Sequence, residues 1–127
     1  MEGSVRAAAP FSAFDHVQLA MPVGEEEKAR HFYCEILGMR EIPKPAALAS
    51  RGGCWFESGS VQIHLGVEIN FRPARKAHPG LRCSNYDALV ANLAAAGISI
   101  DEAGDIPGVR RCHIHDIFGN RLELIAA

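Results

Sequence analysis

The sequence of 127 residues lacks a long hydrophobic run: none approaches the roughly 18 apolar residues that a membrane-spanning helix requires. It also lacks an excess of charge of one sign, because 13 lysines and arginines face 15 aspartates and glutamates, for a formal net charge of −2. A nearly neutral chain offers no broad basic surface for nucleic acid. We therefore expect neither a membrane nor a nucleic acid as a partner.

The sequence lacks a C-x-x-C pair that would indicate a zinc site or a redox motif, because its four cysteines are scattered. Their scatter favours small, partly buried hydrophobic residues with reduced thiols. Residues 1–13 lack the continuous apolar segment of a secretory signal, and we interpret them as a flexible tail. We expect a cytoplasmic protein in which residues 14–127 form a single domain with one core.

Within this domain, the order strand, helix, three strands occurs twice. The first copy has predicted strands over 14–20, 39–42, 53–57 and 61–65, and a helix from 24 that Gly38 ends. The second has predicted strands over 78–84, 98–101, 110–115 and 121–125, and a helix that Asn85 caps and Gly97 ends. We predict an α+β fold of two βαβββ modules, over about 14–66 and 78–127. Together they would form a curved, cup-like mixed sheet with the helices outside.

The spacing inside the two copies aligns four polar residues in pairs. His64 follows Gly38 by 26 residues, and Glu123 follows Gly97 by the same distance. His16 and His78 each lie on the first strand of a copy. Since side chains alternate across a strand, these four residues share the polar face, opposite apolar neighbours that should pack under the helices.

Three histidines and a carboxylate that converge from different strands are typical of a divalent metal site. The ligand types leave iron, zinc, nickel, manganese and cobalt open. Glu123 is the most telling of the four, because a carboxylate in an apolar strand is costly unless it is metal-bound or paired with Arg121 or another nearby arginine. The alternative is a cup that binds an organic ligand without metal. We interpret His31, His113 and His115 as structural histidines.

Several segments resemble the vicinal oxygen chelate superfamily, the group of glyoxalases, bleomycin-resistance proteins and extradiol dioxygenases. Asp15-His-Val-Gln-Leu19 is similar to its first-strand metal motif, and Ala29 to Gly38 to its helix with the closing leucine-glycine. Val61 to Gly66 and His78 to Cys83 resemble its fourth and fifth strands. Asp116-Ile-Phe-Gly-Asn-Arg-Leu-Glu-Leu124 resembles its closing motif with the metal glutamate, with Ile117 in place of the usual proline.

The resemblance implies a divalent ion that chelates adjacent oxygens of a substrate. By residue match, His16, His78 and Glu123 take the positions of the three ligands that dioxygenases and fosfomycin-resistance enzymes share. His64 lies where glyoxalase I has a glutamate that is both ligand and base, so His64 is predicted as a ligand or as the catalytic base beside Glu123. This departure puts strict lactoylglutathione lyase activity in doubt. The resemblance also implies a homodimer.

The remaining polar residues of the predicted cup are candidates for substrate binding. Arginines and lysines would hold an anionic group of a small molecule, and the aromatic ring or amide would contact its body. These candidates are Gln18, Trp55, Arg75, Lys76, Arg82 and Arg121. Either Trp55 or Phe56 faces the cup and the other the core. Three functions stay open: a glyoxalase-like lyase, isomerase or transferase, an Fe(II) dioxygenase, and a metal-free binding protein.

Overall fold

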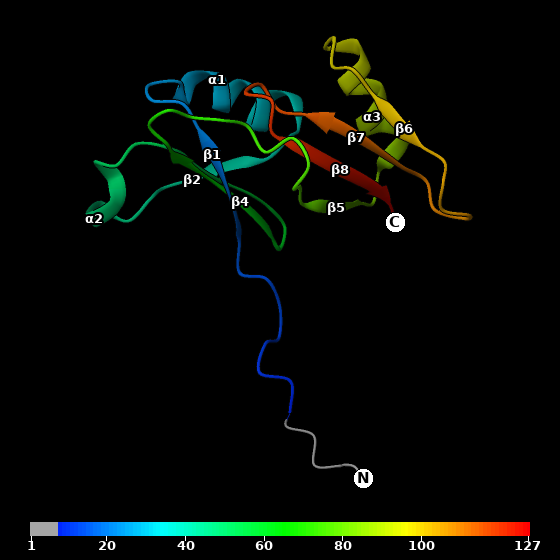
Figure 1. Cartoon of the computed structure of the whole chain (residues 1–127), viewed down its shortest axis with the longest axis horizontal. Helices are drawn as coiled ribbons and strands as arrows, with labels where there is room; N and C mark the ends of the chain where they lie inside the picture. Colours follow the sequence, from blue (N-terminus) through cyan, green and yellow to red (C-terminus); the bar gives the residue numbers. More distant parts are fainter. Residues whose placement is uncertain (1–7) are drawn as a thin grey trace.

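A computed structural model describes residues 8–127 (Figure 1). The predicted tail over 1–13 lies in part outside the described residues, and its residues 8–13 are exposed without helix or strand. They lead away from the domain (Figure 1). Within the described part of the chain, no helix is long and apolar enough to cross a membrane.

The N-terminal module is a four-stranded mixed sheet with the strand order β1-β4-β3-β2, in which β1 is parallel to β4. Its helix α1 continues directly into the π-helix η1, and a short helix α2 follows β2. In chain order the elements are β1 (Val17–Met21), α1 (Glu26–Arg30), η1 (His31–Ile36), β2 (Arg40–Ile42), α2 (Ala46–Ala49), β3 (Cys54–Ser58) and β4 (Val61–Val67).

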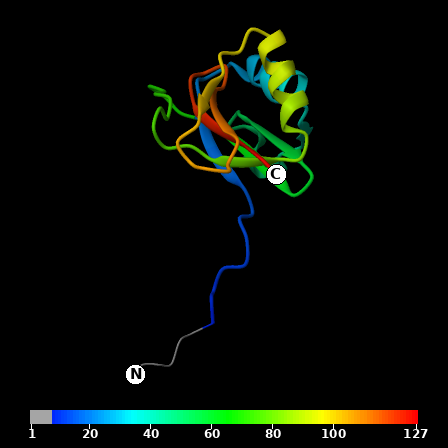
Figure 2. The same ribbon diagram turned by 90° about the vertical axis from the view of Figure 1, so that its right-hand side faces the viewer.

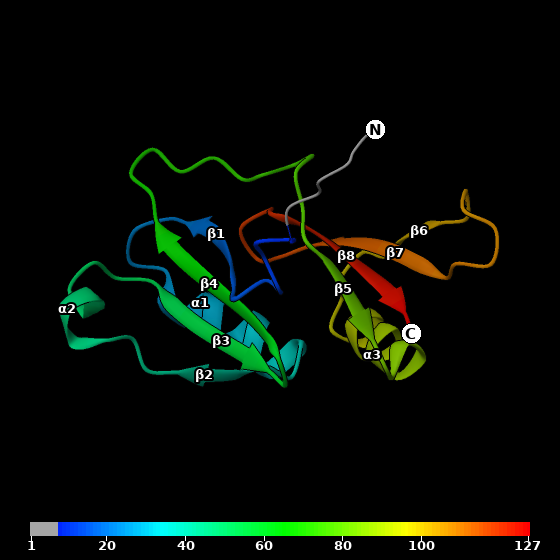
Figure 3. The same cartoon turned by 90° about the horizontal axis from the view of Figure 1, so that it is seen from below.

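The C-terminal module repeats this topology, with the strand order β5-β8-β7-β6 and β5 parallel to β8. Its elements are β5 (Gly80–Cys83), α3 (Tyr86–Ala95), β6 (Asp101–Ala103), β7 (Arg111–His115) and β8 (Arg121–Ala126). The prediction of two βαβββ modules is confirmed. The two sheets lie side by side and stay open rather than closing into a barrel (Figure 3).

Local details differ from the predicted elements for identifiable reasons. β5 begins at Gly80 instead of 78, because Pro79 has no amide hydrogen for the sheet. The first helix is not regular: its second half is a π-helix, in which the Leu37 amide donates to the Phe32 carbonyl at 2.9 Å. Gly38 and Gly97 end the helices with φ of 77° and 81°, as predicted.

The core forms where the apolar face of each sheet meets the helices. Both helices cover the same side of the sheets (Figures 1 and 2). Most of the buried residues come from the helices and from the strands of both sheets, and the largest apolar ones are Met21, Phe32, Tyr33, Phe56, Ile63, Leu65, Leu93, Ile114, Leu122 and Leu124. The opposite face is therefore left for polar residues, as the alternation predicted.

A buried hydrogen-bond network joins the two modules. The Tyr33 hydroxyl, from η1, donates to Asp116 Oδ2 at 2.7 Å in the turn between β7 and β8. The Asn120 amide nitrogen donates to the Ala20 carbonyl of β1 at 2.9 Å and to Asp116 Oδ2 at 3.0 Å. Asp116 and Asn120 are 5% and 1% exposed, so these bonds are shielded from water. The turn thus holds the C-terminal sheet against the first strand and helix of the N-terminal module.

Candidate metal centre

Three residues of the C-terminal module bring their metal-binding atoms together. His78 precedes β5 by two residues, His113 lies on β7, and Glu123 lies directly opposite His113 on β8. One ligand atom of each lies within 4.8 Å of the other two, and no other such trio of His, Cys, Asp or Glu occurs within residues 8–127. Two strand positions and the segment that leads into β5 therefore form a cluster of potential ligands.

The hydrogen bonds of His78 fix which of its nitrogens faces the cluster. Its Nδ1 lies 2.7 Å from the Lys76 carbonyl oxygen, which can only accept, so Nδ1 carries a hydrogen. In the neutral ring Nε2 then has a free lone pair, and it lies 2.9 Å from Glu123 Oε1. Two acceptors at this distance need a proton or a cation to bring them together. A backbone carbonyl that orients a histidine in this way is a common support of metal ligands.

The other oxygen of Glu123 is held by an arginine. Arg111 Nη1 donates to Glu123 Oε2 at 2.9 Å, and Arg111 Nη2 donates to Asp105 Oδ1 at 2.6 Å. Arg111 is therefore the arginine partner that the sequence left open. Burial alone would raise the pKa of Glu123, but the hydrogen bonds from Arg111 and His78 outweigh it and hold the pKa below its ordinary value. Glu123 is thus a carboxylate at neutral pH.

The distances in this cluster fit a divalent ion. Ligand atoms about 2.0–2.2 Å from one ion lie roughly 3–3.5 Å from one another. Glu123 Oε1 lies 2.9 Å from His78 Nε2 and 3.7 Å from His113 Nε2. Glu123 could bind an ion through Oε1 alone, because Oε2 is turned to Arg111. The donor types and their spacing therefore suit zinc, nickel, cobalt, manganese or iron.

The equivalent residues of the N-terminal module are arranged differently. Trp55, His64 and His16 form a stack, with ring centroids 3.9 Å apart between Trp55 and His64 and 4.1 Å apart between His64 and His16. The two imidazole planes differ by only 11°. Since nitrogen lone pairs lie in the ring plane, nearly parallel rings cannot direct them at one ion. In this conformation His16 and His64 form an aromatic surface and do not chelate together.

Further contacts hold the stacked histidines. The Gln62 side-chain oxygen lies 2.9 Å from His64 Nε2, and Asp15 Oδ1 lies 2.9 Å from His16 Nδ1. Burial lowers the pKa of His64, and the neighbouring His16 lowers it further. The neutral His64 ring therefore predominates at neutral pH. The structure also settles the neighbouring pair, because Phe56 is buried in the core while Trp55 lies on the polar face.

The four predicted ligands thus lie as two pairs, His16 with His64 and His78 with Glu123, one pair on each sheet. Neither His16 nor His64 belongs to a close trio of potential ligands in the described part of the chain. That all four bind one ion stays a prediction, which requires the two polar faces to meet.

The predicted substrate-binding residues are spread over several surfaces. Lys76 and Arg121 line an open pocket of about 440 Å³ together with the cluster of His78, His113 and Glu123. Gln18 is paired with His64 in the sheet and lines a neighbouring pocket that also includes His78. Arg75 is exposed and lies outside both of these pockets.

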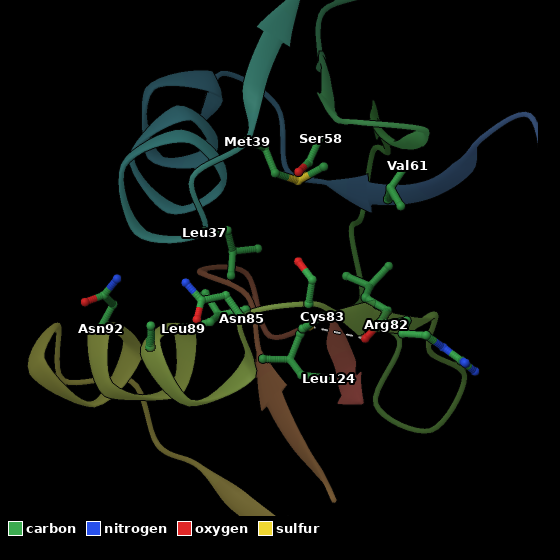
Figure 4. A pocket seen from close by; sticks show the side chains of 13 residues that line it. Leu37, Met39, Ser58, Val61, Arg82, Cys83, Asn85, Leu89, Asn92 and Leu124 are labelled. Carbon is green, nitrogen blue, oxygen red and sulfur yellow. Dashed lines mark hydrogen bonds between the residues drawn. The ribbon is translucent and has the colours of Figure 1, made fainter. Parts of the chain in front are cut away.

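Arg82 belongs to a different part of the molecule. It lines a separate, less polar pocket of about 330 Å³ between the end of η1, the β3–β4 turn, β5 and α3 (Figure 4). Figure 4 shows its guanidinium turned away from the other side chains of this pocket. Neither the His78 cluster nor the Trp55 stack contributes to it.

Sequence reasoning missed two residues of the C-terminal cluster, Arg111 and His113. We interpreted His113 as structural because a lone histidine in a strand usually is. The signal that could have found both is the register of the β7–β8 hairpin. Once the turn over 116–120 is fixed, His113 must lie opposite Glu123, with Arg111 two residues further along the same face.

Paired βαβββ modules that leave one face of their sheets to polar residues define a class of small α+β domains. The family model described as Glyoxalase/Bleomycin resistance protein/Dioxygenase superfamily matches residues 13–124. The chain belongs to this superfamily, and the family resemblance in the sequence is confirmed.

Solved structures give the same fold. A Bacillus anthracis protein provisionally assigned to the glyoxalase family is 46% identical, with a TM-score of 0.91 over 94% of this chain and 98% of that chain. The fosfomycin resistance protein FosX from Listeria monocytogenes is 17% identical, with a TM-score of 0.72 over 92% and 94%. Lactoylglutathione lyase from Agrobacterium tumefaciens is 17% identical, with a TM-score of 0.69 over 94% and 96%. The last two likenesses bear on the fold alone. A search of curated proteins gives no significant match.

Proposed function

We propose that the protein is a divalent-metal-dependent, glyoxalase-like enzyme: a lyase, isomerase or transferase that acts on a small anionic metabolite with adjacent oxygens. The observation that carries this proposal is the pair formed by His78 and Glu123. The carbonyl of Lys76 leaves the free nitrogen of His78 facing a carboxylate oxygen at 2.9 Å. This is the arrangement that a divalent cation would stabilise.

We assign His78 and Glu123 as metal ligands, and His16 as the ligand that the N-terminal module contributes. What the ion supplies when bound is Lewis acidity toward the substrate oxygens. His64 is the candidate general base, because its lowered pKa keeps the ring neutral and able to accept a proton near pH 7. To act in this way, His64 must leave its hydrogen bond with Gln62 or use its other nitrogen.

Positive charge at the rim of the pocket favours an anionic substrate. Lys76, Arg111 and Arg121 all line the pocket that contains Glu123. Arg111 is largely neutralised by Asp105 and Glu123, so Lys76 and Arg121 are the cations available to a substrate carboxylate or phosphate. Gln18 and the exposed edge of Trp55 would contact the rest of the molecule. We assign Arg75 and Arg82 to substrate binding only in an assembly that brings them to this pocket.

A homodimer would bring the polar faces of the two modules together. In one chain the sheets lie side by side (Figure 3), and neither His16 nor His64 belongs to a close trio of potential ligands within residues 8–127. The outer strands β1 and β5 leave sheet edges that a second copy could cover. A site completed by two copies would then contain all four predicted ligands.

We also propose a cytoplasmic location. The four cysteines are free, and two of them, Cys54 and Cys112, are buried in the core. Free thiols suit a reducing compartment.

Metal content tests the proposed function most directly. Protein purified without chelator should contain up to one divalent ion per chain, or take one up from nickel, zinc, manganese or iron solutions. Glu123→Ala should lose that ion. A wild-type protein that neither contains nor takes up any of these metals would exclude a metal-dependent enzyme. Oxygen consumption with Fe(II) and catechols would instead identify a dioxygenase.

One observation favours a second candidate, a metal-free binding protein. Glu123 accepts a hydrogen bond from Arg111, and a proton on His78 Nε2 would supply a second one, so the carboxylate can be satisfied without a metal ion. In that case the Trp55 stack would bind a planar ligand in a cup without metal. Ligand binding that chelator leaves unchanged would support this candidate over the enzyme.

A further inference from the structure

We propose that His113 is a metal ligand, so that the C-terminal module binds the ion by itself through His78, His113 and Glu123. This inference rests on the proposed metal-dependent function and extends it. The family resemblance places ligands on the first and last strands of each module, and β7 is neither. The assignment of His113 therefore comes from the geometry of this sheet alone.

The position of His113 is set by the sheet itself. It is the register partner of Glu123 in the antiparallel pair β7–β8, so its side chain emerges on the same face. Gly80 is the partner of Glu123 on the other side, and its missing side chain leaves that side open to His78. Backbone pairing on both sides of β8 thus places two imidazoles around one carboxylate.

His113 is an almost fully buried side chain next to Glu123. Its side chain is 10% exposed, and that of Glu123 is 13% exposed. Its Nε2 points toward Glu123 Oε1 but stays 3.7 Å away, beyond hydrogen-bond distance. A metal ion between these two atoms could be bound by both of them.

The ring orientations allow both histidines to bind one ion. The planes of His78 and His113 meet at 85°, with centroids 5.2 Å apart. Their in-plane lone pairs can therefore converge, in contrast to the stacked rings of His16 and His64, which differ by 11°. Of the two modules, only the C-terminal one presents imidazoles in a chelating arrangement.

The surrounding charges are compatible with a divalent cation. The cations that line this pocket are Lys76, Arg111 and Arg121. Arg111 contacts Oε2 of Glu123 rather than Oε1, and its second nitrogen is paired with Asp105. Its hydrogen bond would hold the carboxylate so that Oε1 alone faces the ion. His16 would then join the ion only when the two polar faces meet, as the fourth ligand of an ion that is already bound.

The experiment measures Ni²⁺ and Co²⁺ binding to the full chain by calorimetry, after removal of metal by chelator. We expect one ion per chain for the wild type, and at least about tenfold weaker binding for His113→Ala and His113→Phe. Phenylalanine keeps a ring next to His78 but removes the nitrogen, so it separates ligation from packing. His115→Ala is the matched control, because His115 lies on the same strand and face but is exposed; its binding should stay within twofold.

Wild-type affinity in His113→Phe would overturn the inference while leaving the proposed function intact. Absence of binding by the wild type would instead refute both. Because a His113 variant could fail to fold, the reverse variant completes the test: His16→Ala combined with His64→Gln keeps the C-terminal trio. This double variant should still bind one Co²⁺ and retain a visible absorption band. If it binds no ion, the C-terminal module is not a site by itself.

Discussion

The two modules have the same topology but use equivalent positions for different purposes. His64 and Glu123 occupy matching places on the last strands, and each lies opposite a ring on the neighbouring strand, Trp55 in one module and His113 in the other. In the N-terminal module the rings stack in parallel, whereas in the C-terminal module they surround a carboxylate. The repeated fold therefore places residues at equivalent positions in both modules. The chemistry of each position depends on the residue that lies opposite it on the neighbouring strand.

This difference has an electrostatic cause. A neutral histidine at 64 attracts flat partners, because imidazole and indole faces pack well and neither carries a charge. A carboxylate at 123 attracts donors and cations instead, and Arg111 and His78 supply them. One module is thus suited to a flat organic surface and the other to a positive ion.

The largest effect is expected when each of the two equivalent residues, His64 and Glu123, is replaced by glutamine in a separate variant. Glu123→Gln keeps the shape of the side chain but removes the charge that holds the ion, so metal affinity should fall at least about 100-fold. His64→Gln should change it by less than about threefold. Titration calorimetry with Ni²⁺ on both variants measures the difference. Equal losses in both variants would mean that the modules contribute equally to the metal centre.

The next largest effect is a loss of stability, expected when the buried hydrogen-bond network that joins the two modules is weakened. Tyr33→Phe removes the hydroxyl that donates to the buried Asp116 carboxylate at 2.7 Å. A hydrogen bond to a charged group contributes roughly 1.5–3 kcal/mol, so the free energy of unfolding should fall by about 2 kcal/mol. Urea denaturation measures this, with Tyr86→Phe as the comparison, because the Tyr86 hydroxyl has the Cys112 thiol rather than a carboxylate as its partner. A loss no larger than that of Tyr86→Phe would show that the network does not stabilise the chain.

A smaller effect is expected from the aromatic stack. Trp55→Leu keeps an apolar side chain over His64 but removes the stacked ring, which should cost about 0.5–1.5 kcal/mol of unfolding free energy. Metal affinity should be unchanged, because Trp55 lies in the other module from the proposed ion. The same denaturation and calorimetry experiments measure both quantities. Weaker metal binding by Trp55→Leu would contradict the proposal that the ion is bound by the C-terminal module and not by the N-terminal one.

The smallest effect is the pH dependence of the metal-free protein, in which the modules should behave alike. Burial lowers the pKa of both His64 and His113 below the ordinary value of 6.5, so below that pH the unfolded chain binds more protons than the folded one. Their contribution to stability is therefore complete above pH 6.5 and is lost as the pH falls through their lowered pKa values. Thermal unfolding between pH 5 and 7.5 should show this decline, and His64→Phe or His113→Phe should each reduce it. A pH-independent melting temperature would contradict both shifts.

Much of the fold could be predicted because it depends on local patterns. Alternation identified the strands that carry the site, and Gly38 and Gly97 marked the ends of both helices. No local pattern predicted the π-helix, which contains the fully buried Phe32 and Tyr33. The short helix α2 was hidden by the prolines around it.

Only those residues of the candidate site that repeat symmetry or a family motif indicates could be predicted. The symmetry and the motifs pointed to His78 and Glu123, which the structure brings together, and to His16 and His64, which it stacks on each other. Ring orientation depends on neighbours such as Trp55 and the Lys76 carbonyl, which no spacing rule describes. To predict Arg111 and His113 as neighbours of Glu123, the register of the β7–β8 hairpin would have been needed.

The junction of Tyr33, Asp116 and Asn120 has a consequence for how such domains can be recombined. Because its side chains come from both modules, neither module can be exchanged for that of a relative without a matching partner. A chimaera that takes a foreign C-terminal half must also carry the aspartate and asparagine of its closing turn to meet the tyrosine of η1. The two halves of the molecule are therefore coupled through buried side chains, although each carries its own sheet and its own candidate chemistry.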